Sequence, residues 1–314
     1  MQTHPPSTTE IIDYTPRYKT YFRDLNLEWI MAYFTVEEPD QRVLNNPEEY
    51  ILQQGGFIFF AIYNGEVAGT CALIKEDEQV YELAKMAVSP KFQGKKIGKV
   101  LCQYAIEKAL ETGAKKLVLV TNSKLEAARQ MYKKLGFIEV DFPPAERIYE
   151  RGNVKMELSL PLYAVKQAAT QLKAIIHTVE PLLKTILPQQ ASLKPLPDKW
   201  SNKEIMGHLI DSASNNQHKW IRVCERDGIQ FPGYSQDFWV LTQNYQQADW
   251  FFLIEFWKQY NLHLAHFMQQ FTPEILSHQI SIAGDVPVTL EHMALDYGRH
   301  LLHHLKQILP DLSV

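Results

Sequence analysis

The chain has 314 residues, of which 46% are hydrophobic and 22% charged, and its formal net charge is −4. This length exceeds that of a typical single domain, so we predict two domains, each with a core of its own. The slightly acidic balance excludes a nucleic-acid or anionic-membrane role that depends on the whole surface. The three cysteines fit neither a disulfide framework nor a zinc C-x-x-C motif. With no signal peptide and no apolar span of about 18 residues, the sequence predicts a cytoplasmic protein.

The first part of the chain is predicted to be helical and then to form β-hairpins. Residues 11–52 have helical spacing, with an acidic loop at residues 37–40. Residues 57–63 and 67–73 flank Asn64-Gly65, a dipeptide suited to a type I′ turn, and therefore predict a hairpin. A second hairpin is expected to return into a strand at residues 82–88.

A strand–helix–strand unit follows. The strand at residues 82–88 leads into a helix over residues 97–112, which Gly113 ends, and residues 116–121 form a buried strand. Two strands joined in this way are expected to be parallel, with a right-handed connection. A helix at residues 124–135 and strands at 137–142 and 153–160 then complete a domain over residues 1–160.

The loop between the first strand and the helix of this unit has the features of a phosphate site. The unpaired N–H groups of a helix N-terminus attract anions, and Gly94 and Gly98 allow close approach of the main chain. Four lysines add charge: Lys91, Lys95, Lys96 and Lys99. Neither the Rossmann nor the Walker glycine pattern is present. A solvated lysine-rich face is the alternative, but the position predicts binding of a diphosphate.

Beyond Pro161 the strand signals vanish, and residues 161–314 are predicted to form an all-α domain. Helical spacing covers residues 163–186, 250–271 and 289–309, and Ser201 with Glu204 forms a capping box at the start of another helix. A long aromatic crossover, residues 231–245, joins two of the helices. The pattern predicts a helical bundle.

Three histidines of this bundle are candidate metal ligands. His300 and His304 are one helical turn apart at the edge of an apolar face, and His208 borders the apolar stripe of its own helix. Imidazoles spaced in this way can share a metal ion, although they are also common as partly solvated bundle residues.

The first domain resembles the GNAT superfamily of acetyl-CoA-dependent N-acyltransferases. The resemblance rests on Gln93-Gly94-Lys95-Lys96-Ile97-Gly98 and on residues 121–137, TNSKLEAARQMYKKLGF. It implies a mixed central sheet with flanking helices, and an acetyl group transferred from acetyl-CoA to a primary amine by direct attack. Lys96 stands where the family's middle glycine is usual, which is compatible with diphosphate binding if its φ is negative. The implied cofactor-binding residues are Met86, Ala87, Val88, Gln93, Gly94, Lys95, Lys96, Ile97, Gly98, Lys99 and Asn122.

The same resemblance assigns catalytic roles. It places Tyr132 within reach of the coenzyme A sulfur as the proton donor and Asn122 beside the pantetheine arm. Tyr132 can alternatively be a packing aromatic, and Asn122 can cap the helix that follows it. Glu82, at the head of the central strand, is the leading candidate for the base. Its competitors are a water chain or one of Glu37, Glu38 and Asp40.

The second domain is similar to the DinB-like family of four-helix metalloproteins, which includes thiol-dependent transferases. The similarity lies in residues 199–222, KWSNKEIMGHLIDSASNNQHKWIR, and 297–308, YGRHLLHHLKQI. It implies a four-helix bundle with zinc or nickel on His208, His300 and His304. Three neutral ligands would leave an open coordination position, as in catalytic sites.

Three functions follow from these observations. The leading one is an N-acetyltransferase whose acceptor is a small-molecule or peptide amine; the acidic loop hints at a cationic acceptor. The alternatives are a metal-dependent thiol transferase or hydrolase centred on the second domain, and a non-enzymatic acyl-CoA-binding regulator. We expect neither nucleic acid nor a membrane as a partner. The sequence is compatible with a homodimer but does not predict one.

Overall fold

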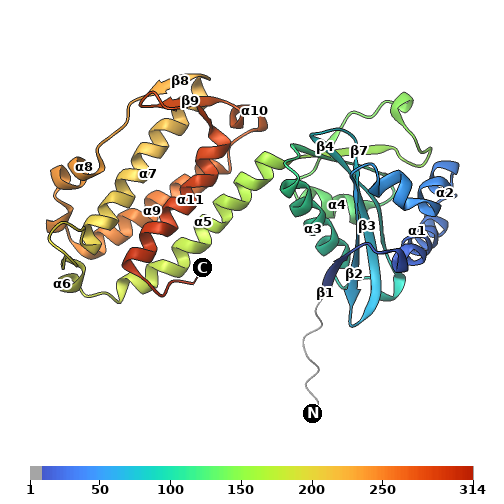
Figure 1. Cartoon of the computed structure of the whole chain (residues 1–314), viewed down its shortest axis with the longest axis horizontal. Coiled ribbons are helices and arrows are strands. Elements are labelled where there is room, and N and C mark those ends of the chain that lie inside the picture. The colour runs from blue at the N-terminus through green and yellow to red at the C-terminus, as the bar shows by residue number, and fades with distance from the viewer. Residues whose placement is uncertain (1–8, 314) are drawn as a thin grey trace, which may run out of the picture. The chain divides into compact units, whose positions relative to one another are not determined.

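The computed structural model describes residues 9–313, and the chain divides into two compact units, Met1–Leu160 and Pro161–Val314 (Figure 1). Each unit has its own hydrophobic core, so we describe them separately.

The first unit is a mixed seven-stranded sheet with helices on both faces. Its strand order is β1-β2-β3-β4-β5-β7-β6, and β4 with β5 is the parallel pair among otherwise antiparallel neighbours. Helix α3 covers one face, and α1 with α2 covers the other (Figure 1). This arrangement confirms the predicted fold class. The strands are β1 (Thr9–Asp13), β2 (Phe57–Tyr63), β3 (Glu66–Lys75), β4 (Val80–Val88), β5 (Lys116–Thr121), β6 (Ile138–Val140) and β7 (Val154–Ser159). The helices are α1 (Lys19–Tyr33), α2 (Glu38–Asn45), α3 (Ile97–Glu111) and α4 (Glu126–Lys134).

The local signals of the central segment are confirmed. Asn64 and Gly65 both have positive φ, +51° and +82°, as a type I′ turn requires. Helix α3 ends just before Gly113, whose φ of +81° allows the left-handed termination that a side chain resists. Strand β5 has the predicted bounds, and it pairs with β4 in parallel.

Two expectations for the N-terminal region are wrong. Residues 9–13 form the edge strand β1, antiparallel to β2, rather than the start of a helical region. This five-residue segment becomes a strand only because the edge of β2 lies beside it, so its own sequence carries little signal. The acidic residues 37–40 are not a loop either, because Glu37 caps α2 and the Asp40 carboxylate accepts the Glu37 N–H.

The second unit is mainly helical. Four long helices enclose one core in which Trp220, Trp250 and Trp257 are fully buried. The predicted capping box is present: the Ser201 hydroxyl accepts the Glu204 N–H at 3.3 Å, and the Glu204 carboxylate accepts the Ser201 N–H at 2.8 Å. The long helices are α5 (Leu160–Lys184), α7 (Asn202–Glu225), α9 (Trp250–Met268) and α11 (Leu290–Ile308), and the short ones are α6 (Pro188–Ala191), α8 (Gln236–Gln243) and α10 (Pro273–Leu276).

The expectation that this unit has no strands is wrong. A small sheet of order β10-β9-β8 joins β8 (Ile229–Phe231), β9 (Gln279–Ile282) and β10 (Val288–Thr289). These strands are two to four residues long, too short for a readable alternation, and β8 pairs with a segment about 50 residues further along the chain.

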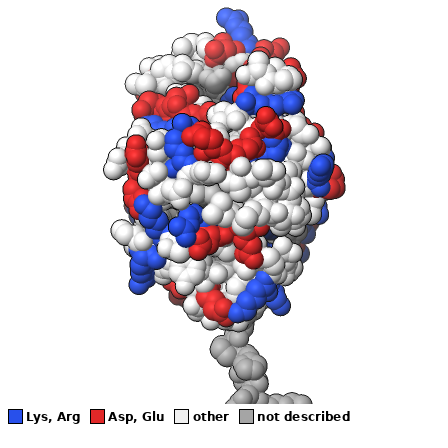
Figure 2. All heavy atoms as spheres, turned by 90° about the vertical axis from the view of Figure 1, so that its right-hand side faces the viewer, with Lys and Arg blue, Asp and Glu red and all other residues white. Residues whose placement is uncertain are grey.

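The surface carries charge of both signs. Figure 2 shows the face of the first unit that bears α1 and α2, where Lys and Arg are interspersed with Asp and Glu. A mixed surface of this kind produces no large single-sign field. None of the helices in residues 9–313 combines the length and apolarity that a bilayer crossing requires.

Gly207 of α7 lies where a side chain has no room. A Cβ at this position would fall 2.0 Å from the ring of Tyr245, whereas a Cβ at Gly298 of α11 would meet no heavy atom within 4 Å. We predict that Gly207→Ala destabilises the second unit by about 1–3 kcal/mol through overpacking. Gly298→Ala, the matched control, should stabilise it by up to about 1 kcal/mol because alanine favours the helix.

Urea unfolding of the full chain, followed by tryptophan fluorescence, measures this difference, since five of the six tryptophans lie beyond residue 160. Equal midpoints for the two variants would contradict the close approach of Tyr245 to α7.

Candidate functional site

A cavity of about 410 Å³ opens in the first unit where β4 and β5 part. The parallel pairing of these strands runs only from Val80 opposite Lys116 to Glu82 opposite Val118, although β4 continues to Val88. Beyond Glu82, no described strand pairs with β4 on this side. The backbone groups of residues 83–88 that face β5 are therefore open to a ligand, as the GNAT resemblance implies for residues 86–88.

A bulge in β4 lies beside this opening. The register with β3 changes between Thr70 opposite Ala87 and Ala72 opposite Ala84, so β4 contains an extra residue. Lys85, at the bulge, has φ +50°, which is unusual for a residue with a side chain. Bulges of this type re-aim side chains next to active sites. Here Lys85 becomes part of the cavity wall.

The loop before α3 presents free backbone donors. Among the hydrogen bonds of the described residues, none uses the N–H of Lys96, Ile97 or Gly98, which form the N-terminus of α3. These groups are suited to an anion, because they are unpaired and carry the positive end of the helix dipole. The Ile97 side chain is buried in the core, so only its main chain is available. Lys91 is already paired with Glu66 at 2.5 Å.

The condition set for Lys96, a negative φ, is not met. Its φ is +62°, in the left-handed region, where an L-residue pays about 1–2 kcal/mol. Glycine avoids this cost, which explains physically why the family pattern has glycine at this position. Lys96 nevertheless keeps its N–H at the start of α3.

Tyr132 reaches the cavity from α4. Its side chain is 8% exposed, its hydroxyl donates to the Met86 sulfur at 3.7 Å, and its ring packs edge-to-face against Phe137. Burial raises the pKa of this phenol, so it stays protonated at neutral pH. The residue is therefore both a packing aromatic and a hydroxyl at the cavity wall.

Asn122 also lines the cavity, but its amide makes internal hydrogen bonds. Its oxygen accepts the Lys124 N–H at 2.8 Å, and its nitrogen donates to the Arg151 carbonyl at 2.5 Å. The alternative role of Asn122, a cap of the next helix, is wrong, because α4 begins at Glu126 and its N-cap is Leu125. Asn122 instead forms a turn before the helix and holds the segment around Arg151.

Glu82 lies where the β4–β5 pairing ends. Burial raises its pKa to about 6, and among the described residues its carboxylate makes no hydrogen bond or ion pair. The competing acids differ. Asp40 is fully buried in ion pairs, Glu37 is paired with Arg151, and Glu38 is exposed and outside the cavity lining. Glu82 is thus the lining carboxylate best placed to accept a proton.

A buried charged group at one wall of the cavity was not anticipated. Asp40 of α2 binds Arg151 through two contacts, at 2.6 and 2.7 Å, and Lys85 at 3.0 Å. Burial alone would raise the pKa of Asp40, but the hydrogen bonds from Arg151 and the charge of Lys85 outweigh burial and hold the pKa below its ordinary value. The three residues are at least 45 positions apart in the sequence, so no local sequence pattern indicates this group.

The residues of the implied cofactor site thus fall into two sets. Some line the cavity with their side chains or main chain, and the rest of the loop lies next to it. The lining set is Met86, Val88, Gln93, Gly98 and Asn122. The residues outside the lining are Ala87, Gly94, Lys95, Lys96, Ile97 and Lys99.

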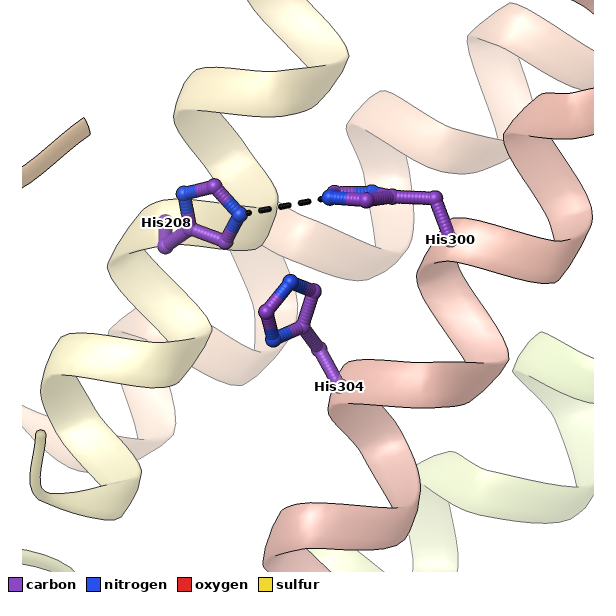
Figure 3. A group of neighbouring side chains, drawn as sticks. All are labelled: His208, His300 and His304. Carbon is purple, nitrogen blue, oxygen red and sulfur yellow. Dashed lines mark hydrogen bonds between the residues drawn. The ribbon is translucent and has the colours of Figure 1, made fainter. Parts of the chain in front are cut away.

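In the second unit, the three predicted histidines meet. His208 points from α7 toward His300 and His304 of α11, and one ring nitrogen of each lies within 4.8 Å of the others (Figure 3). The Nε2 atoms of His208 and His300 are 3.4 Å apart. Two ligands about 2.0–2.1 Å from a tetrahedral zinc ion would be about 3.3–3.4 Å apart, so this spacing suits a shared metal.

The electrostatics of the three rings also suit a metal. Burial, followed by mutual repulsion, lowers the pKa of His208 to about 3 and that of His300 to about 4, and burial lowers that of His304. All three are therefore neutral at pH 7. The Nδ1 atoms of His300 and His304 lie 3.4 Å from the Ser212 hydroxyl and 3.2 Å from the Gln307 amide oxygen. The Gln307 oxygen can only accept, so it favours a proton on Nδ1 of His304, and the Ser212 hydroxyl can accept one from Nδ1 of His300. With these tautomers the Nε2 lone pairs are free for a metal.

Comparison with known proteins separates the same two parts of the chain. Residues 23–137 match the acetyltransferase (GNAT) family, and residues 171–308 match the DinB superfamily. An uncharacterized N-acetyltransferase of Escherichia coli, YjgM, is 33% identical over 114 residues, 35% of this chain and 65% of that relative. The N-acetylaspartate synthetase of Xenopus tropicalis is 33% identical over 99 residues, 31% of this chain and 36% of that relative.

The chain thus spans less than two thirds of either relative. Among solved structures, a GNAT-family acetyltransferase of Staphylococcus aureus Mu50 has 28% identity and a TM-score of 0.45, covering 49% of this chain and 99% of its own. Taken together, the family matches show a GNAT acetyltransferase domain in the first unit and a DinB-superfamily domain in the second.

Proposed function

We propose that the first unit is an N-acetyltransferase that moves the acetyl group of acetyl-CoA to a primary amine by direct attack. The observation that carries this proposal is the early end of the β4–β5 pairing. It creates one cavity bordered by an unpaired strand, a carboxylate at Glu82 and a phenol at Tyr132.

Acetyl-CoA would bind along this opening. The diphosphate would accept hydrogen bonds from the free N–H groups of residues 96–98, with Lys95, Lys96 and Lys99 adding positive charge. The amides of pantetheine would pair with the unpaired backbone of residues 86–88, much as another strand would.

The chemistry then needs two proton transfers. The amine nitrogen attacks the thioester carbonyl, the carbon–sulfur bond breaks, and the thiolate leaves. Glu82 would take the ammonium proton, directly or through water, because its pKa of about 6 leaves it ionised yet basic at neutral pH. Tyr132 would protonate the sulfur. Burial raises the pKa of the Tyr132 phenol, which by itself disfavours proton donation. A thiolate in the same buried site would also have a raised pKa, which favours accepting the proton.

The acceptor is proposed to be a small-molecule or peptide amine. Several relatives are N-acetylaspartate synthetases, whose name indicates a small acceptor. The cavity also has room for a compact molecule beside the acetyl group.

Tyr132→Phe tests the proposal. The ring stays packed on Phe137 while the hydroxyl is lost, so we expect kcat to fall by roughly 10²-fold or more with little change in acetyl-CoA affinity. Release of the coenzyme A thiol with an amine panel reports kcat, and calorimetry reports the affinity. Tyr104→Phe on α3, outside the cavity lining, is the matched control. Unchanged turnover would remove Tyr132 from this role, and absence of acetyl-CoA binding by the full chain would overturn the function.

The pKa of Glu82 predicts a pH-dependent stability. The folded-state pKa of about 6 exceeds the ordinary value of 4.5, so protonation favours the folded state. The stabilisation by protonated Glu82 is fully present below about pH 4.5 and is lost as the pH rises through about 6. Relative to Glu82→Gln, the wild type should lose about 2 kcal/mol of unfolding free energy between pH 4.5 and 7.5. Denaturant titrations of both proteins at each pH measure it, and a constant difference would contradict the raised pKa.

For the second unit, we propose that His208, His300 and His304 hold a divalent metal ion, zinc or nickel. Their neutral rings, the 3.4 Å Nε2 spacing and the two Nδ1 contacts support this assignment. Such an ion supplies Lewis-acid chemistry when it has an open coordination position. In the protein's own residues, Ser212 and Gln307 would orient the rings of His300 and His304.

Removal of one ligand should release the metal. His304→Ala should contain clearly less zinc or nickel than the wild type by elemental analysis after dialysis, because two ligands remain. His303→Ala is the control, since this residue neighbours His304 on α11 but lies outside the three-histidine group. Full metal retention by His304→Ala would exclude the site.

A further inference from the structure

One wall of the cavity in the first unit is built from paired charges. We call it the Asp40 cluster, and it comprises Asp40, Lys85, Arg151, Tyr149 and Glu37. The Asp40 side chain is fully buried and that of Lys85 is 6% exposed. Buried charged groups need partners of opposite charge or hydrogen bonds. The donors and acceptors that remain after this pairing are the ones that a ligand could use.

The acceptor atoms of the cluster are already used. The Asp40 carboxylate accepts four hydrogen bonds: two from Arg151, one from Lys85 and one from the Glu37 N–H. A carboxylate has about four acceptor positions, so Asp40 is saturated. The Glu37 carboxylate accepts from Arg151 at 2.8 Å and from the Glu150 N–H at 2.9 Å, and it lies outside the cavity lining.

The donors of the cluster are not all used. Lys85 donates to Asp40 and, at 2.8 Å, to the Tyr149 hydroxyl, which leaves one of its three N–H groups. Arg151 makes three of the five hydrogen bonds that a guanidinium can donate. The Tyr149 hydroxyl accepts from Lys85, so its own hydrogen is available. All three residues line the cavity.

The backbone is shaped to hold these donors in place. Lys85 adopts its positive φ at the β4 bulge, and both Lys85 and Arg151 stack on the Tyr149 ring, with their charged groups 4.6 and 4.4 Å from its centroid. Strained backbone of this kind persists where the surrounding contacts over-determine it, often at ligand-binding sites. Glu82 lies three positions from Lys85 on the same strand and also lines the cavity.

We propose that Lys85, Tyr149 and Arg151 bind a carboxylate group of the acceptor, so that the acceptor is a small amino acid whose amine reaches Glu82. This inference rests on the proposed function. The roughly four free donors match the acceptor positions of one carboxylate, and charge-assisted bonds of this type are strong. An amino-acid acceptor also replaces the cationic acceptor that the acidic residues 37–40 suggested. The carboxylates of Asp40 and Glu37 are already paired within the cluster and are not available to a cation.

An acceptor panel tests the proposal directly. The full-length protein is given acetyl-CoA with glycine, β-alanine, 4-aminobutyrate, L-aspartate and L-glutamate, each paired with its primary amide, and with spermidine as a polycation. Release of the coenzyme A thiol is measured. We expect kcat/KM to favour at least one acid over its amide by tenfold or more, since hydrogen bonds to a charged group are lost in the amide.

Two variants connect that preference to the cluster. Tyr149→Phe keeps every ion pair of Asp40, and Lys85→Met leaves Asp40 bound to Arg151, so both retain a paired carboxylate. Each should raise KM for the preferred acid by roughly tenfold, with KM for acetyl-CoA little changed. Tyr149→Phe should also leave kcat and kcat/KM for the amide little changed. Lys85→Met removes a charge that lowers the pKa of Glu82, so its kcat is compared with that of the wild type over a pH series. Tyr21→Phe, at an exposed tyrosine of α1, is the matched control.

The outcomes separate the inference from the function on which it rests. Transfer that favours the amides or spermidine overturns the carboxylate site and leaves the acetyltransferase proposal standing. An acid preference that survives in both variants also overturns it. A protein that binds acetyl-CoA but acetylates no amine of the panel contradicts the proposed function, and this inference is overturned with it.

Discussion

The first unit depends on a hydrogen-bond ladder that stops early. Strands β4 and β5 start side by side and pair over three residues each, but β4 extends six residues beyond Glu82 without that neighbour. Unpaired backbone groups inside a protein are costly unless something satisfies them. The opening therefore both weakens the sheet and creates a place where a ligand with amide groups can bind. The bulge at Lys85 and the free N–H groups before α3 lie at the edge of the same gap.

Both units contain buried polar side chains that hydrophobic packing cannot explain, and one group in each borders a candidate site. In the first, Asp40 is satisfied by Arg151 and Lys85, which attach the segment around Tyr149 to α2 and to β4. In the second, His208 is fully buried against His300 and His304, and its Nδ1 has no hydrogen-bond partner among the described residues. In the first group the acceptor positions of Asp40 are all used while donors of Lys85 and Arg151 remain, whereas in the second group a buried ring nitrogen of His208 is left without a partner.

Features that depend on neighbouring residues were predicted from the sequence, and features that depend on distant residues were not. The hairpin at Asn64-Gly65, the end of α3 at Gly113 and the capping box at Ser201 are local, and all three were predicted correctly. The histidine group was found because a helical period places His300 and His304 on one face. The edge strand β1 and the small sheet of the second unit were missed, because partners distant in the sequence create these strands.

What the sequence by itself determined is therefore most of the long helices and strands, the fold class of each half and the loop that begins α3. These follow from periodicity, turn residues and caps, which act over a few residues. Only the tertiary structure decided the left-handed conformation of Lys96, the isolation of Glu82 and the Asp40 cluster. The cluster joins Asp40, Lys85 and Arg151 from three separate segments. Their charges are close together only when the sheet and its helices are packed, and local propensities do not encode contacts between distant segments.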